Sequence, residues 1–121
     1  MISDELIKRT KTFAVNVIRF YQNLPKTEEA RIIGKQLLRS GTSVAANYRA
    51  ANRSRSKEEF YSKLCIVVEE SDETIFWLEL LNEAGIVDEM KISTIKKEGE
   101  ELLHIFSASR KTLKNNLNSK K

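Results

Sequence analysis

A stretch just past the middle of the chain carries the pattern that most constrains its fold. Seven positions there recur in alternating steps of four and three residues: Phe60, Leu64, Val67, Ser71, Thr74, Leu78 and Leu81. This spacing is typical of a long helix that packs a narrow seam against neighbouring helices. Similar helical periodicity runs through most of the sequence, and one Pro and four Gly leave little to interrupt it. The pattern therefore predicts a few long helices.

Local signals place the ends of these helices. Thr27 is suited to cap the start of a helix that follows the break at Pro25. Ser56 and the glutamate three residues later match a capping box. Gly85 is typical of the residue that follows a helix end, and Asp88 can cap the next helix. A glycine at position 41, inside the second helix, is expected to bend it.

These signals predict four helices joined by short connections. The expected helices cover about residues 4–22, 28–51, 57–84 and 89–117. Long helices with short joints pack against their neighbours in alternating directions. The expected fold is therefore an all-α, antiparallel up-down-up-down four-helix bundle that forms a single domain of residues 1–121.

Size and composition narrow the class of protein. With 121 residues, of which 40% are hydrophobic, the chain can bury a core of its own. The N-terminus is polar and no long apolar run follows it, so neither a signal peptide nor a membrane partner is expected. The single cysteine, Cys65, cannot form an internal disulfide, which favours a cytoplasmic protein.

The net charge of +4 conceals two blocks of opposite sign. Residues 26–57 hold eight basic and two acidic residues, which gives 8 − 2 = +6. Residues 58–84 hold one basic and eight acidic residues, which gives 1 − 8 = −7. The two blocks can pair with each other, or the basic block can bind a polyanion.

The basic block forms an ordered strip if the second helix is continuous. Five of its cations fall within a sector of roughly 80° on a helical wheel, and a sixth follows in the next joint. We call these six residues the basic strip: Arg31, Lys35, Arg39, Arg49, Arg53 and Arg55. Such a strip can bind the phosphates of RNA or DNA, or it can be a solvated or ion-paired face. No sequence motif of a specific nucleic-acid-binding fold accompanies it.

The third helix carries large apolar residues among its acids, on the face opposite the seam. We call this set the outer face of the third helix: Ile66, Glu69, Glu70, Glu73, Phe76, Trp77 and Leu80. Aromatic side chains on a charged face are typical of a second buried surface. The face is therefore expected to mediate self-association with a neighbour's basic strip, although its aromatics can also cover the flank of their own bundle.

No catalytic residue, metal site or cofactor is predicted. Glu101 and His104 have the Glu-x-x-His spacing of di-iron bundles, but that site needs a second histidine and His104 is the only one. Cys65 follows Leu64 in an apolar run and is interpreted as a small core residue. The chain is therefore not expected to be an enzyme.

Two segments, residues 36–51 and 56–81, resemble the four-helix-bundle family of 23S rRNA intervening-sequence proteins, often labelled S23 ribosomal proteins. The resemblance implies a bacterial, cytoplasmic homopentamer. It also implies distant kinship with the accessory proteins of diversity-generating retroelements, which work beside nucleic acid. Many members have Glu-Gly where this chain has Ala50 and Ala51, so a role of that pair is not transferred.

Two hypotheses follow for the function. In the first, a non-catalytic ring, a pentamer by resemblance, binds RNA or DNA through the basic strip. In the second, the chain is a structural oligomer or an adaptor for another protein, and its basic strip pairs with the acidic third helix of the same or a neighbouring subunit.

Overall fold

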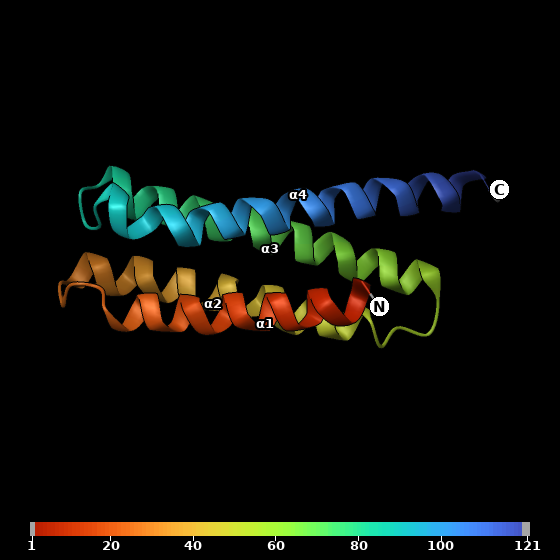
Figure 1. The fold of residues 1–121 in the computed structure, drawn as a ribbon, viewed down its shortest axis with the longest axis horizontal. Coiled ribbons are helices and arrows are strands. Elements are labelled where there is room, and N and C mark those ends of the chain that lie inside the picture. Colours follow the sequence, from red (N-terminus) through yellow and green to blue (C-terminus); the bar gives the residue numbers. More distant parts are fainter. Residues whose placement is uncertain (1, 120–121) are drawn as a thin grey trace.

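The computed structural model describes residues 2–119 as four antiparallel helices without strands. They are α1 (Ile2–Gln22), α2 (Glu28–Ala51), α3 (Lys57–Glu83) and α4 (Glu89–Ser119). Each helix runs back along the one before it, and Figure 1 shows α1 and α2 below α3 and α4. The prediction of an all-α up-down-up-down bundle is confirmed, and every helix end lies within two residues of its expected place.

The helix ends follow the predicted caps. The hydroxyls of Thr27 and Ser56 accept hydrogen bonds from backbone N–H groups three residues on, over 3.3 and 3.1 Å. Asp88 caps α4 by accepting from the N–H of Lys91 over 3.0 Å. At the end of α3, Gly85 has a φ of +74°, and the N–H of Ile86 donates to the carbonyl of Leu81. This Schellman motif ends α3 and turns the chain into α4.

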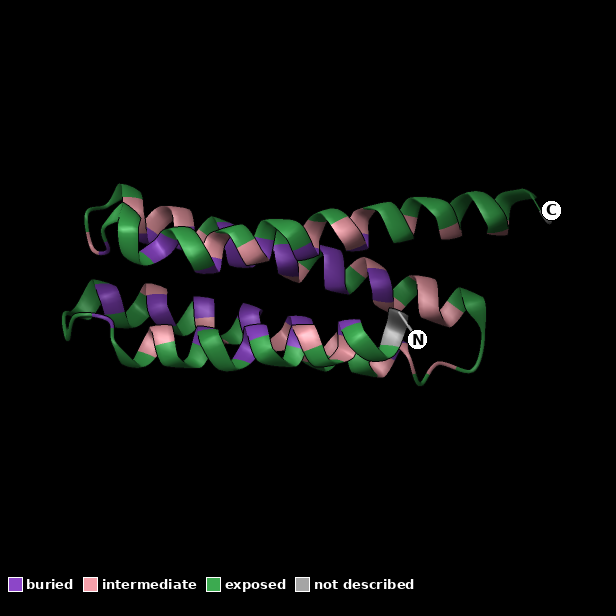
Figure 2. Ribbon diagram, in the orientation of Figure 1, coloured by how far each residue is buried: buried purple, intermediate pink, exposed green. Residues whose placement is uncertain are grey.

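The core runs along the whole contact between the helices, as the buried band in Figure 2 shows. It contains six of the seven residues of the predicted seam of α3, whereas Phe60 at its start is half-buried. Tyr48 of α2 packs on Phe106 of α4, with ring centroids 4.8 Å apart. α2 and α3 share the largest interface, and α1 and α4 share the smallest. The bundle is therefore most open between α1 and α4.

Gly41 does not end or interrupt α2, which is helical from Glu28 to Ala51. The glycine instead lets α1 and α2 approach each other closely. A Cβ atom at this position would lie 2.8 Å from Cγ1 of Val17, which is fully buried. Gly41 is therefore a point of tight helix–helix contact within a continuous helix.

Two further features concern the length of α4 and the hydrophobicity of the helices. The C-terminal part of α4 extends beyond the ends of the other helices in Figure 1. Within residues 2–119, no helix is long and apolar enough to cross a lipid bilayer.

Candidate functional site on α2 and α3

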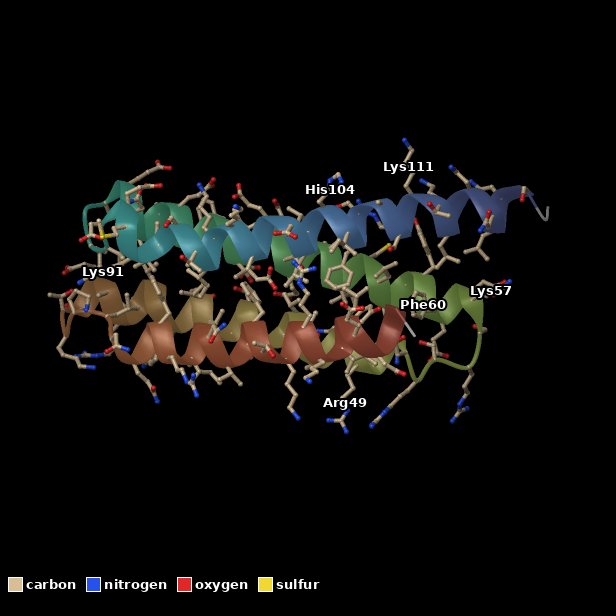
Figure 3. All side chains as sticks on the ribbon, in the orientation of Figure 1. Arg49, Lys57, Phe60, Lys91, His104 and Lys111 are labelled. Atoms are coloured by element: carbon tan, nitrogen blue, oxygen red, sulfur yellow. The ribbon has the colours of Figure 1, made fainter. Side chains whose placement is uncertain are left out.

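The six residues of the basic strip all have exposed side chains. Four of them lie on α2, and Arg53 and Arg55 lie in the joint between α2 and α3. In Figure 3, Arg49 points away from the bundle. The strip is therefore a feature of the surface, as its sequence pattern predicts.

Among the residues that the structure describes, Arg39 is the one member of the strip that an ion pair holds against the bundle. Its guanidinium lies 3.3 Å from a carboxylate oxygen of Glu70 on α3 and also donates a hydrogen bond to Glu73. The hydrogen bond to Glu73 is the main reason why the pKa of Arg39 is raised above its usual value. Trp77 donates its indole N–H to the same Glu73 oxygen over 2.9 Å.

The other five cations of the strip have a different electrostatic environment. An ion pair joins a side-chain nitrogen and a carboxylate oxygen that lie within 4.0 Å of each other. None of the ion pairs among the described residues involves Arg31, Lys35, Arg49, Arg53 or Arg55. No carboxylate of the chain offsets the charge of an unpaired surface cation, so such a cation attracts an external anion more strongly than a paired one does. The strip therefore divides into one internally paired arginine and five cations that face solvent.

The outer face of α3 is partly apolar and partly occupied by this ion-pair network. Phe76 and Ile66 are 50% and 41% exposed, and Glu69 is exposed as well. Trp77 and Leu80 are half-buried. The rings of Phe76 and Trp77 pack edge to face, with their centroids 4.9 Å apart. Trp77 therefore partly covers the flank of its own bundle, whereas Phe76 faces outward.

The residues considered for chemistry do not form a cluster. His104 is exposed on α4 and points outward in Figure 3. Cys65 is half-buried rather than buried, as its place beside the seam allows. Across residues 2–119, no three His, Cys, Asp or Glu side chains gather in a way that could hold a metal ion.

A further hollow lies elsewhere, along the open side between α1 and the start of α4. It encloses about 800 Å³, and its wall includes Phe13, Phe20 and Ile95. No residue of the basic strip or of the outer face of α3 lines it. The outer face of α3 is therefore an exposed face, and so is most of the basic strip, although Arg55 lines a shallow hollow beside the α2–α3 joint.

Sequence reasoning missed a second group of cations on α4, in which Lys111 and Lys114 are exposed and Arg110 is half-buried. Arg110, Lys111 and Lys114 lie in its last three turns. The signal was present in the sequence, because no acidic residue follows Glu101. These cations are remote in the chain from the +6 block, and only the fold brings the two groups to the same end of the bundle.

Comparisons with known proteins agree with this architecture. Residues 4–108 match the family described as 23S rRNA-intervening sequence protein. A crystal structure of a protein of unknown function from the S23 ribosomal protein family of Bacteroides thetaiotaomicron VPI-5482 superimposes with a TM-score of 0.84. The two chains are 31% identical, and the match covers 92% of this chain and 99% of the other. A comparison with curated proteins finds no match.

Proposed function

The chain belongs to the 23S rRNA-intervening sequence protein family, and we propose that it is a non-catalytic, homo-oligomeric bundle that binds RNA or DNA through its basic strip. The pentameric ring implied by the family resemblance is the form of assembly that we expect, in the cytoplasm of a bacterium. The family names do not by themselves make the protein a ribosomal component.

One observation carries the nucleic-acid part of the proposal. Five exposed cations of the strip have no carboxylate within 4.0 Å among the described residues. Such cations gain most from a polyanion, because phosphates replace solvent and bound counterions are released. Arg39 contributes little to this surface, because Glu70 and Glu73 already neutralise it.

A second observation favours a structural or protein-adaptor role. Phe76 and Ile66 expose apolar surface on α3 beside the carboxylate of Glu69. A neighbouring subunit that covered this surface could bring Arg49 or Arg53 of its own strip against the acids. In that arrangement the cations would serve assembly, as Arg39 does within one chain.

The two roles differ in what the strip binds, and a binding titration separates them. We propose to measure the affinity of the intact protein for a labelled RNA and for a DNA of the same sequence over a range of salt concentrations. The variant Arg49→Gln/Arg53→Gln/Arg55→Gln should bind more weakly, and its slope of log affinity against log salt should fall by about 2 for three lost phosphate contacts.

A charge-matched variant controls for net charge. Lys8→Gln/Lys11→Gln/Lys97→Gln removes three exposed cations from α1 and α4 and should leave the salt slope unchanged. The proposal fails if Arg49→Gln/Arg53→Gln/Arg55→Gln binds as tightly as the wild type. It also fails if that variant falls apart into monomers under conditions in which the wild type is assembled, since the strip would then belong to the interface.

A further inference from the structure

The antiparallel fold brings two basic segments, distant in sequence, to one end of the bundle. The joint between α2 and α3 lies at the end at which α4 overhangs (Figure 1). Within residues 2–5, 49–60 and 107–119, which form this end, seven basic and four acidic residues give 7 − 4 = +3. The cations are Arg49, Arg53, Arg55, Lys57, Arg110, Lys111 and Lys114. We call this region the overhang end.

The opposite end of the bundle has a different charge. Residues 19–31 and 80–91, which form it, hold four basic and five acidic residues, which gives 4 − 5 = −1. None of the seven cations at the overhang end takes part in an ion pair of the described residues. The field of the molecule therefore directs a polyanion to the overhang end.

Two open hollows meet at this end around Phe60. They enclose about 410 and 390 Å³, and Phe60 lines both. The remaining wall of the first comes from α4, and that of the second comes from the joint between α2 and α3. Figure 3 places Phe60 and Lys57 at the start of α3 and Lys111 on the part of α4 above Phe60, with the Lys111 side chain pointing away from the bundle.

The walls of both hollows are suited to a nucleobase. They hold neutral hydrogen-bonding side chains such as Asn52, Thr112 and Asn116, two cations, Arg55 and Lys57, and no carboxylate. The hydroxyl oxygen of Ser54 is buried there without a hydrogen-bond partner among the described residues.

On these grounds we propose that the overhang end binds single-stranded nucleic acid, with a base against Phe60 and the flanking phosphates on the cations of the α2–α3 joint and of α4. Aromatic floors with surrounding cations are the usual means of binding single strands, because an unpaired base exposes its faces for stacking. A duplex hides those faces and would meet only the cations. This inference rests on the proposed function and adds the form of the nucleic acid and the place where it binds.

The experiment compares three labelled ligands with the intact protein by fluorescence anisotropy: oligouridylate, oligothymidylate and a duplex of the same length. The wild type should bind at least one single strand more tightly than the duplex. Arg110→Gln/Lys111→Gln/Lys114→Gln should weaken single-strand binding and flatten its salt dependence. Lys8→Gln/Lys11→Gln/Lys97→Gln should change neither property. A preference for oligouridylate or for oligothymidylate would show whether the protein favours RNA or DNA.

Phe60→Leu tests the stacking contact. Leucine keeps an apolar side chain at a half-buried position but removes the aromatic face. Single-strand affinity should fall at least about fivefold, with an unchanged salt slope, because stacking carries no charge. If this variant does not fold, Asn116→Asp provides a second test. It places a carboxylate in an exposed wall of the hollow and should weaken binding in the same way.

The possible failures are distinguishable. If Arg49→Gln/Arg53→Gln/Arg55→Gln weakens binding but neither the α4 variant nor the variants at Phe60 and Asn116 do, this inference is wrong and the proposed function stands. Equal or tighter binding of the duplex by the wild type would also overturn the inference alone. If the wild type binds none of the three ligands, both proposals fail.

Discussion

Thr74 of α3 and Ser40 of α2 join the two helices through a buried hydrogen bond, with their hydroxyl oxygens 3.0 Å apart. Both side chains have an exposed fraction of 0%. Each hydroxyl also lies within hydrogen-bond distance of a carbonyl of its own helix, at Leu37 for Ser40 and at Glu70 for Thr74. A polar pair within an apolar interface favours one alignment of the helices, because any shift leaves a hydroxyl without its cross-helix partner.

The first prediction concerns this pair. Thr74→Val preserves the shape of the side chain but removes the bond to Ser40, so the free energy of unfolding should fall by about 1 kcal/mol. Urea denaturation measures this change. Thr42→Val is the matched control, because the hydroxyl of Thr42 is half-buried and bonds only to carbonyls of its own helix. Equal stability of the two variants would show that the cross-helix bond contributes nothing.

The second prediction concerns the close contact between α1 and α2. Gly41→Ala gains about 1 kcal/mol of helix propensity but inserts a methyl group 2.8 Å from a methyl of Val17, which should cost about 1–3 kcal/mol. We expect a net loss of stability in thermal and urea denaturation. In the double variant with Val17→Ala the loss should be smaller than the sum of the two single losses, because the removed methyls leave space for the new one.

Additive losses would contradict that interpretation of Gly41. They would mean that the glycine is needed for its backbone and not for the approach of α1.

The features that the sequence predicted correctly depend on neighbouring residues. Ser56, Thr27, Asp88 and Gly85 act on the backbone within a few positions, so their spacing alone places the helix ends. The seam from Leu64 to Leu81 is likewise a property of one helix. These local rules were sufficient for the fold class.

The features that sequence reasoning missed depend on contacts between distant segments. A helical wheel assigns Arg39 to the basic strip, but it cannot show that the side chain reaches Glu70 and Glu73 on another helix. The role of Gly41 depends on Val17 of α1, and the charge of the overhang end depends on α4 returning to the α2–α3 joint. These contacts between different helices can be identified only from the three-dimensional arrangement of the bundle.

The third prediction separates Arg39 from the rest of the strip. Arg39→Gln should lower stability by no more than about 1 kcal/mol, because the Arg39 side chain is 49% exposed and solvent screens its pairs with Glu70 and Glu73. It should also weaken RNA binding less than Arg49→Gln, whose side chain has no ion-pair partner among the described residues. Anisotropy titrations at one salt concentration make the comparison. A larger binding loss for Arg39→Gln would place the phosphate contact beside Arg39, where α2 packs against α3, and not at the joint between the two helices.

The fourth prediction is a dependence of stability on alkaline pH. Burial raises the pKa of Tyr48 above its ordinary value of 10.0. The unfolded chain therefore loses the phenolic proton before the folded chain does. The stabilisation linked to this proton is complete below about pH 10 and is lost as the pH rises through the raised folded pKa. Tyr48→Phe keeps the packing against Phe106 and removes the titrating group.

Urea denaturation of both proteins from neutral pH to about pH 11 provides the measurement. The stability of the wild type should fall more steeply above about pH 10 than that of Tyr48→Phe. The difference between the proteins isolates Tyr48 from the other tyrosines. Parallel curves would show that its hydroxyl remains accessible to solvent in the folded state.

The fifth prediction concerns assembly through the outer face of α3. Phe76→Asp should shift the protein from an oligomer to monomers in light scattering, because it places a charge in the centre of the apolar surface that a neighbour would bury. Phe76 is the better site than Trp77, whose indole is half-buried and bonded to Glu73, so that its replacement would also disturb the fold. Met90→Asp is the matched control, since Met90 is 86% exposed at the start of α4. An intact assembly of the Phe76 variant, or a wild type that is already monomeric, would exclude this face as the interface.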